Sequence, residues 1–186
     1  MRKVALAHVV AKFQGAGDSY YLLYRHRKWG DWSFVGGHVE PGEEGLWVRT
    51  AIRETEEELP PLHHRRDFIL VPLLGKPLTW GPQRSKSAAG EMTVYTAQFF
   101  RMVFRNNPLQ LLSSALGRDV VFVRGEDLTV HEQVAEMVRR LDGCLQGGLD
   151  AIPPAWECLP MEAELVRHLS MTHGTQDAGE STLACG

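Results

Sequence analysis

The sequence predicts an α+β domain whose helices pack against a mixed β-sheet. Three observations support this prediction: apolar runs typical of strands in the first third, an amphipathic helix before further strands, and a helical pattern after the last strand. This order of elements is typical of a layered α+β or α/β/α architecture. At 186 residues, the chain is long enough for one well-cored domain and short for two.

The N-terminal third is predicted to be β structure. Residues 3–12 and 20–26 are apolar runs, and the turn-rich letters FQGAGDS connect them. A short strand, SFV, follows a basic and aromatic stretch. Because His8 interrupts the first run and Lys12 closes it, with no small-residue cleavage site after it, a strand is a better interpretation than a signal peptide.

An amphipathic helix is predicted from about Gly45 to Leu59. Its apolar positions recur at helical spacing and form one stripe, made of Val48, Ile52, Thr55 and Leu59. Pro60 and Pro61 end the helix, because the residue before a proline avoids the helical region and proline has no N–H to donate.

Further strands are predicted at 67–74, 92–104 and 119–124. The first two are separated by a long loop, residues 75–91, which is rich in Gly, Pro and Ser. A loop of this length inside a compact domain is more often functional than incidental. We therefore expect this loop to contribute to a binding site.

A second helix is predicted to start at Thr129, which forms a capping-box pattern with Glu132. Its apolar stripe comprises Val130, Val134, Met137, Val138 and Leu141. A connector at 143–160 precedes a shorter helix at about 161–169. The last residues, 173–186, have the composition of a disordered tail.

Composition and charge exclude several classes of function. The net charge of −3 and the pI of about 6.2 argue against a nucleic acid polymer or an anionic membrane as partner. No stretch approaches the ~18 apolar residues of a spanning helix. Three widely spaced cysteines, Cys144, Cys158 and Cys185, form neither a disulfide framework nor a metal knuckle. These features favour a reducing, cytoplasmic location.

The chemistry is concentrated in the letters GGHVEPGEEGLWVRTAIRETEEELPP, which begin at Gly36. Glu54, Glu57 and Glu58 lie at i, i+3 and i+4, so a helix would place them on one face, roughly 130° from the apolar stripe. Clustered carboxylates repel one another, and a hard divalent cation, Mg²⁺ first, would relieve that repulsion. A glutamate-rich helix alone is more often a solvated face than a metal site, so the wider pattern decides the interpretation.

That wider pattern resembles the Nudix box. Gly37 is followed after five residues by Glu43, and later by Arg53-Glu54, two residues, and Glu57-Glu58. The family box has a glycine, five residues, a glutamate, seven residues, Arg-Glu, an apolar residue, any residue, Glu-Glu, any residue, a glycine and an apolar residue. The match covers about 25 residues.

The chain departs from the box at two places. Nine residues, where the family has seven, separate Glu43 from Arg53, and Pro60 stands in place of the final glycine. Two extra residues within a helix would rotate everything downstream by about 200°. The site would survive only if the loop absorbs them before the helix begins, and Gly45, a poor helix-interior residue, favours this.

The resemblance implies a Nudix-like α/β/α sandwich with a mixed β-sheet and a loop–helix–loop catalytic motif at 37–61. A single domain would then span 1–172, with a helical extension at about 129–172. Such proteins cleave a diphosphate bond in a nucleoside diphosphate linked to another group. They use Mg²⁺, with Mn²⁺ as an alternative. The expected partner is therefore a small nucleotide-like molecule.

Residue by residue, the resemblance implies two sets of roles. The metal ligands would be Glu54, Glu57, Glu58 and a backbone carbonyl of the Gly36-Gly37 pair. Arg53 and Glu43 would pair and fix the loop against the helix. The general base would be Glu54 or Glu57 within the box, or Glu91 at the end of the long loop; our hypothesis is a box glutamate.

Substrate selection is expected outside the box. Candidates for stacking a base or gripping a phosphate are Trp80, Arg84 and Lys86 in the long loop, and Arg25, Arg27 and Lys28 before the box. Each of these is also compatible with an ordinary surface position. Two questions stay open at this point. The protein could be a catalytically impaired Nudix-like module that binds a nucleotide or a protein, and the helix at 161–169 could complete the domain or form a homodimer interface.

Overall fold

A computed structural model describes most of the chain. The described residues are 1–15, 18–85, 88–131, 134, 136, 137, 139–141 and 159–160. Several predicted features lie outside them: Glu132 of the capping pattern, the helix at 161–169, the tail at 173–186 and all three cysteines. Among the described residues, no helix is long and apolar enough to cross a membrane.

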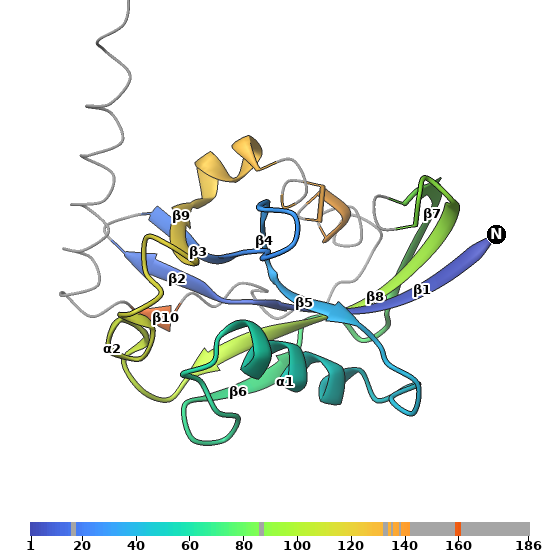
Figure 1. Ribbon diagram of the computed structural model, residues 1–186. Coiled ribbons are helices and arrows are strands. Elements are labelled where there is room, and N and C mark those ends of the chain that lie inside the picture. The colour runs from blue at the N-terminus through green and yellow to red at the C-terminus, as the bar shows by residue number, and fades with distance from the viewer. Residues whose placement is uncertain are drawn as a thin grey trace, which may run out of the picture.

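The first of two five-stranded sheets forms the centre of the molecule (Figure 1). Its strand order is β5 (Val35–His38), β1 (Arg2–Val10), β8 (Met92–Phe104) and β6 (Phe68–Pro72), and β7 (Leu78–Arg84) also pairs with β8. β1 and β8 run parallel, whereas the other pairs in this sheet are antiparallel. The predicted mixed sheet is therefore present.

The second sheet is built around β3. Its members are β10 (Leu159–Pro160), β2 (Lys12–Gly15), β3 (Asp18–Arg25) and β4 (Trp32–Ser33), with β9 (Val120–Arg124) paired to β3. β1 and β2 are separated by a single residue, Ala11, so the chain passes from one sheet directly into the other. Strands in two sheets with few helices confirm the predicted α+β class.

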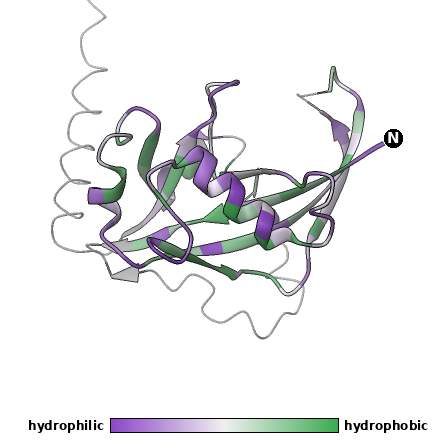
Figure 2. Cartoon of the chain, turned by 60° about the horizontal axis from the view of Figure 1, so that its bottom comes forward, coloured by the Kyte–Doolittle hydropathy of each residue, from purple (hydrophilic) through white to green (hydrophobic). Residues whose placement is uncertain are grey.

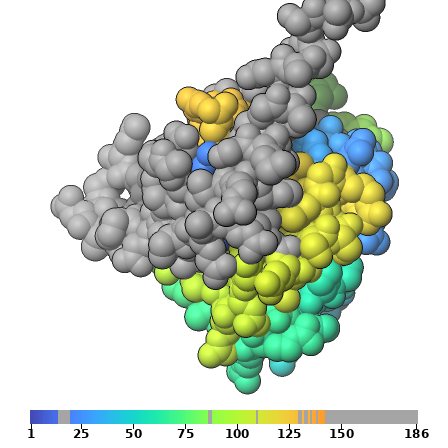
Figure 3. Space-filling view, turned by 90° about the vertical axis from the view of Figure 1, so that its left-hand side faces the viewer, coloured from blue at the N-terminus to red at the C-terminus, as the bar shows by residue number. Residues whose placement is uncertain are grey.

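Helices lie on both sides of the first sheet. α1 (Trp47–Glu58) packs mainly on β5 and β1, and the helical residues between 134 and 141 lie on the opposite side in Figure 1. A short helix, α2 (Pro108–Leu112), follows β8. In Figure 3 the segment from the end of β8 to β9, coloured lime to yellow, lies between green and blue segments from the first half of the chain.

The alternation of side chains along β8 divides the core into two parts. Phe100 and Met102 belong to the cluster that contains Ala51 of α1, whereas Ala97 and Phe99 belong to a second cluster. Val134 and Leu141 are in that second cluster, with 0% and 2% of their surface exposed. Successive residues of a strand point to opposite faces, so one apolar strand supplies both layers.

Three predicted connections contain strands. The letters FQG of the first connector belong to β2, the loop at 75–91 contains β7, and the connector at 143–160 ends in β10. Gly81 and Pro82 concealed β7 from the sequence pattern. The strand accommodates them through a register shift between Trp80 and Gln83. Regular pairing is interrupted there, so no N–H is needed from Pro82.

The predicted helix boundaries need two corrections. α1 begins at Trp47, two residues later than expected. The second helical region starts earlier than Thr129, with a 3₁₀ helix, η1 (Gly125–Val130). Glu126 and Asp127 lie in its first turn, where acidic side chains favour a helix start. Thr129 lies within this 3₁₀ helix, whereas Glu132 lies outside the described residues, so the capping-box pattern stays a prediction.

The predicted apolar stripe of α1 is only partly correct. Thr55 and Leu59 are buried, but Val48 is 41% exposed, and Thr50 and Ala51 are fully buried instead. Small residues let the helix lie close to β5 and β1, and the Thr55 hydroxyl is satisfied by donating to the Ala51 carbonyl. Figure 2 shows α1 largely purple beside the greener strands, because its packing face is narrow.

Candidate active site

The loop between β5 and α1 brings the acidic residues together. Gly42 and Gly45 adopt positive φ angles of 93° and 78°, which glycine tolerates without a steric penalty. The Leu46 amide donates to the Glu43 carbonyl over 2.8 Å, and α1 begins directly afterwards. The two residues in excess of the family box therefore do not shift the register of the helix.

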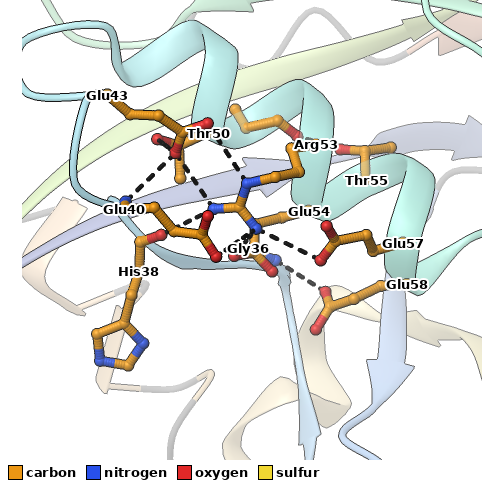
Figure 4. Close-up of polar contacts among 11 residues, drawn as sticks. Gly36, His38, Glu40, Glu43, Thr50, Arg53, Glu54, Thr55, Glu57 and Glu58 are labelled. Carbon is orange, nitrogen blue, oxygen red and sulfur yellow. Dashed lines mark hydrogen bonds and ion pairs between the residues drawn. The ribbon is translucent and has the colours of Figure 1, made fainter.

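Arg53 is the hub of this region (Figure 4). Its guanidinium donates to Glu43 over 3.2 Å, which is the expected pair, and to the His38 carbonyl over 3.0 Å. It also donates to Glu54 over 2.9 Å and to Glu57 over 3.3 Å. Arg53 thus ties the loop, β5 and two of the three clustered glutamates to one positive charge.

Glu43 is held as a carboxylate by this arrangement. The hydrogen bond from Arg53 and then that from Thr50 lower the pKa of Glu43 to about 2. Burial disfavours the charged guanidinium, but the hydrogen bonds and charges of Glu43 and Glu54 outweigh it and raise the pKa of Arg53. Because both partners stay ionised throughout the neutral pH range, the pair is suited to an orienting role.

Two glutamates of α1 contact the glycine pair of β5. The Gly36 amide donates to Glu58 Oε2 over 2.9 Å. The Glu54 carboxyl group lies against Gly37 so closely that a Cβ atom there would overlap with Glu54 Oε1. Glycine at 37 therefore leaves the space that the Glu54 carboxyl group occupies. Gly36 is required by the backbone as well, because its φ is 147° and a Cβ there would overlap with the Ala7 carbonyl oxygen.

Burial makes ionisation of two of these glutamates unfavourable. Burial raises the pKa of Glu58 to about 8, with smaller increases from Glu54 and Glu57, despite the hydrogen bond from Gly36. Burial also raises the pKa of Glu54, although Arg53 opposes this. Glu57, 58% exposed, is the most accessible of the three. The site thus contains more carboxyl groups than the nearby positive charge can neutralise. A divalent cation bound between them would supply the missing positive charge.

The described residues do not include three His, Cys, Asp or Glu side chains that already converge on one point. The reason is visible in Figure 4: Glu54 and Glu57 point to Arg53, and Glu58 points to the Gly36 amide. The three side chains are neighbours on α1, but Arg53 holds two of them and the Gly36 amide holds the third.

We expect Gly37→Ala to displace the Glu54 carboxyl group while leaving the fold intact. The new Cβ would contact only the end of a flexible side chain, so the stability loss should be about 1 kcal/mol. Divalent-metal affinity, measured by calorimetry, should fall at least tenfold. Gly75→Ala is the matched control, because a Cβ at Gly75 meets nothing within 4 Å. Unchanged metal affinity in Gly37→Ala would contradict the position assigned to Glu54.

A cavity of about 340 Å³ lies on the other side of the glycine pair. Residues from β1, the turn between β3 and β4, β4, β5, β7, β8 and the helical region after η1 line it; they include Leu6, His8, Trp29, Gly36, Gly37, Trp80, Tyr95 and Arg140. Its volume falls in the range of small-molecule sites. β5 therefore separates an acidic surface from an aromatic cavity.

The structure brings some of the predicted substrate residues to this cavity. Trp80 and Arg84 line it, whereas Arg25 does not, and Lys86 lies outside the described residues. Arg25 is exposed at the end of β3, where its side chain donates to the Gly30 carbonyl over 3.3 Å. Glu91 is exposed in the turn between β7 and β8.

Sequence reasoning missed the most unusual residue of the cavity, His8. It is 5% exposed, and neither ring nitrogen makes a hydrogen bond of ordinary geometry within the described residues. Burial lowers the pKa of His8 to about 4, and the nearby His38 lowers it further, while an interaction with the backbone of Val35 opposes both. The signal in the sequence was a histidine in the middle of an otherwise apolar strand.

Comparison with known proteins identifies the family. The family model described as the NUDIX domain matches residues 1–111, more than half of the 186-residue chain. The chain belongs to the Nudix family. No curated protein matches it. The Nudix assignment agrees with the box at 37–61 and with the fold around it.

Solved structures share the Nudix fold at low sequence identity. The crystal structure of the C. elegans Ap4A hydrolase is 24% identical, with a TM-score of 0.52, and the match covers 78% of this chain and 99% of that one. NrtR from Shewanella oneidensis is 13% identical, with a TM-score of 0.52 and coverage of 91% and 85%. NrtR complexed with a 27mer DNA matches with a TM-score of 0.50 at 13% identity, covering 91% and 83%.

Proposed function

We propose that the protein is a metal-dependent Nudix hydrolase that cleaves a diphosphate bond in a nucleoside diphosphate linked to another group. One observation carries the proposal: three glutamates lie on one side of α1, two of them against the glycine pair of β5, and Arg53 holds the preceding loop in place. Family membership supports the same interpretation of the box.

The residues present fit a divalent cation of the Mg²⁺ or Mn²⁺ kind. Glu54, Glu57 and Glu58 would hold it, together with a carbonyl of Gly36 or Gly37. The raised pKa values of Glu54 and Glu58 support this, because they mark carboxyl groups whose burial the nearby positive charge and hydrogen bonds do not fully offset. When bound, such a cation supplies charge neutralisation for the diphosphate and activation of the attacking water.

The contacts of Arg53 suggest what the protein itself contributes. Its bonds to Glu43 and to the His38 carbonyl fix the loop and β5 relative to α1, so the glutamates face a defined position. Phosphoryl transfer depends mostly on positioning and charge stabilisation, and a rigid loop–helix unit provides the positioning. In this proposal Arg53 and Glu43 orient the site and do not react.

A box glutamate is the better candidate for the general base. Gly37 pairs with Ala7, which pairs with Gln98 of β8, and Glu91 precedes Gln98 by seven residues. Seven residues of extended strand span about 23 Å, too far for a carboxylate to reach a water beside Glu54. Figure 1 agrees, because the β7–β8 turn and the end of α1 that leads to β6 lie at opposite ends of β8.

Glu91→Gln should therefore leave the pH–rate profile of diphosphate hydrolysis unchanged within twofold. The acidic limb reports the protonation of the base, and in this proposal that base is a glutamate of α1. Profiles of kcat/KM between pH 5 and 9 for the wild type and Glu91→Gln would decide the matter. Loss of the acidic limb in Glu91→Gln would assign the base to the turn.

A second candidate is a Nudix-like module that binds a nucleotide or a protein without cleaving it. The observation that favours it is the engagement of both Glu54 and Glu57 by Arg53, which competes with any cation for the same oxygens. The NrtR likeness shows that a Nudix fold occurs in a protein crystallised with DNA. The net charge of −3 gives this chain no general attraction for such a polymer.

The deciding experiment is phosphate release from a substrate panel with Mg²⁺ or Mn²⁺. The panel contains nucleoside triphosphates, ADP-ribose, nucleotide sugars and dinucleoside polyphosphates, and calorimetry measures metal binding in parallel. Metal-dependent turnover of one class supports the hydrolase and names its substrate. Absence of both turnover and metal binding would favour the binding module.

A further inference from the structure

The hydrogen bonds of Arg53 account for all the N–H donors of its guanidinium group. Nε donates to Glu43 over 3.4 Å, and Nη2 donates to Glu43 over 3.2 Å and to the His38 carbonyl over 3.0 Å. Nη1 donates to Glu54 over 2.9 Å and to Glu57 over 3.3 Å. One end of the guanidinium is therefore anchored to the loop and β5, whereas the other end engages two of the glutamates proposed to hold a cation.

A cation held by Glu54 and Glu57 would compete with Nη1 of Arg53. Nη1 donates to both carboxylates, so a cation bound by the same pair would lie close to it, and two positive charges at such a distance repel each other. Nη1 must then give up at least one of its acceptors. Because only 23% of the Arg53 side chain is exposed, a donor left there without an acceptor would be costly.

Glu40 has the carboxylate that is placed to accept this end of Arg53 (Figure 4). Its Oε1 lies 3.8 Å from the same Nη1 atom, which is an ion-pair distance but too long for a hydrogen bond. The side chain of Glu40 is 62% exposed, so a movement of about 1 Å would bring it into hydrogen-bond range without repacking. The backbone of Glu40 is held by Glu43, whose amide donates to the Glu40 carbonyl over 2.9 Å. Glu40 thus combines an anchored backbone with a carboxylate that has room to move.

We propose that Glu40 is a positioning residue of the metal site, whose carboxylate accepts Nη1 of Arg53 when a divalent cation binds Glu54 and Glu57. The inference rests on the proposed function only for the presence of the cation. Nε and Nη2 keep their bonds during this exchange, so the loop stays fixed on α1 while the two glutamates change partners. Arg53 then releases the glutamates without leaving a donor unpaired, and the competition between Arg53 and the cation is relieved.

The test measures Mg²⁺ binding to the full chain by calorimetry, without substrate. Glu40→Ala is compared with Glu44→Ala, which removes the same charge from the same loop at an exposed side chain that accepts from the Gly42 amide. Glu40→Ala should bind Mg²⁺ about fivefold more weakly than Glu44→Ala, the effect of one partly exposed ion pair. Glu40→Gln, which retains an acceptor without the charge, should recover part of the affinity. With Mg²⁺ bound, the Nη1 hydrogens of Arg53 should exchange with water faster in Glu40→Ala than in Glu44→Ala, as followed in ¹⁵N-edited spectra.

Outcomes separate this inference from the proposed hydrolase. Equal Mg²⁺ affinity of Glu40→Ala and Glu44→Ala would overturn it, and so would a crystal structure with Mg²⁺ in which Glu40 coordinates the ion itself. Weaker Mg²⁺ binding by Glu40→Ala, with no hydrolysis of any nucleotide by the wild type, would leave the role of Glu40 standing and remove the hydrolase. Metal-dependent hydrolysis by the wild type, with equal Mg²⁺ affinities of the two variants, would do the reverse.

Discussion

Glu57→Gln is expected to lower metal-dependent turnover of the nucleotide substrate by about 10²–10⁴-fold. Glu57 is the most exposed of the three clustered glutamates, and its described polar contact is with Arg53. Substitution at such a position changes stability by about 0.5 kcal/mol or less. A loss of activity would thus reflect the chemistry of the carboxylate and not the fold. The measurement is kcat and KM with Mg²⁺, together with the melting temperature of both proteins.

Glu56→Gln is the matched control for this prediction. It makes the same chemical change one residue earlier on α1, where the side chain accepts a hydrogen bond from the His64 amide that Gln would preserve. It should retain full activity. Equal activity in Glu57→Gln and the wild type would show that Glu57 neither binds the metal nor acts as base, and would overturn the role proposed for it.

The acidic site could be predicted from the sequence because it is local. Glu43, Arg53 and Glu54 lie within one loop–helix unit, so their spacing along the chain limits their positions in space. The predicted pair of Arg53 and Glu43 is present for this reason. The additional hydrogen bonds of Arg53 to Glu54 and Glu57 were not predicted. The spacing of residues along a helix does not determine which of several nearby carboxylates a guanidinium group binds.

The packing of α1 was harder to predict because tertiary contacts decided it. Hydropathy favoured Val48 as a buried residue, yet the contacts of Glu54 and Glu58 with β5 turn the helix so that Thr50 and Ala51 face the sheet. Two polar anchors thus outweigh the burial of one valine, which would contribute about 1.5–3 kcal/mol. The contacts of Glu54 and Glu58 with β5 also place these two carboxylates beside the core, and not on the opposite face of α1.

The cavity could not be predicted because seven separate segments build it. His8 and Tyr95 are far apart in the sequence and line one cavity only because β1 pairs in parallel with β8. Trp80 reaches them through β7, a strand hidden by Gly81 and Pro82. No spacing rule joins such positions. A lone histidine in an apolar strand was the available signal, and it indicates a buried polar group without identifying what it faces.

Glu58→Gln is expected to stabilise the metal-free protein at alkaline pH. The pKa of Glu58 is raised from 4.5 to about 8 in the folded state, so its contribution to stability is fully present below pH 4.5 and is lost as the pH rises through 8. Each pKa unit corresponds to about 1.4 kcal/mol, so wild-type stability should fall by roughly 1–2 kcal/mol between pH 6.5 and 8 through this group. Gln removes the charge and still accepts from the Gly36 amide.

The window from pH 6.5 to 8 isolates Glu58 from the buried His8. The pKa of His8 is lowered from 6.5 to about 4, so His8 costs stability only as the pH falls below 6.5. Urea unfolding of both proteins in EDTA, at pH 6.5 and 8, should therefore give a steeper loss for the wild type. Parallel losses would mean that Glu58 is already ionised in the metal-free protein. Added Mg²⁺ should then reduce the difference at pH 8 by stabilising the wild type more than the variant. A cation that binds the ionised Glu58 carboxylate stabilises the folded state, and the variant lacks that ligand.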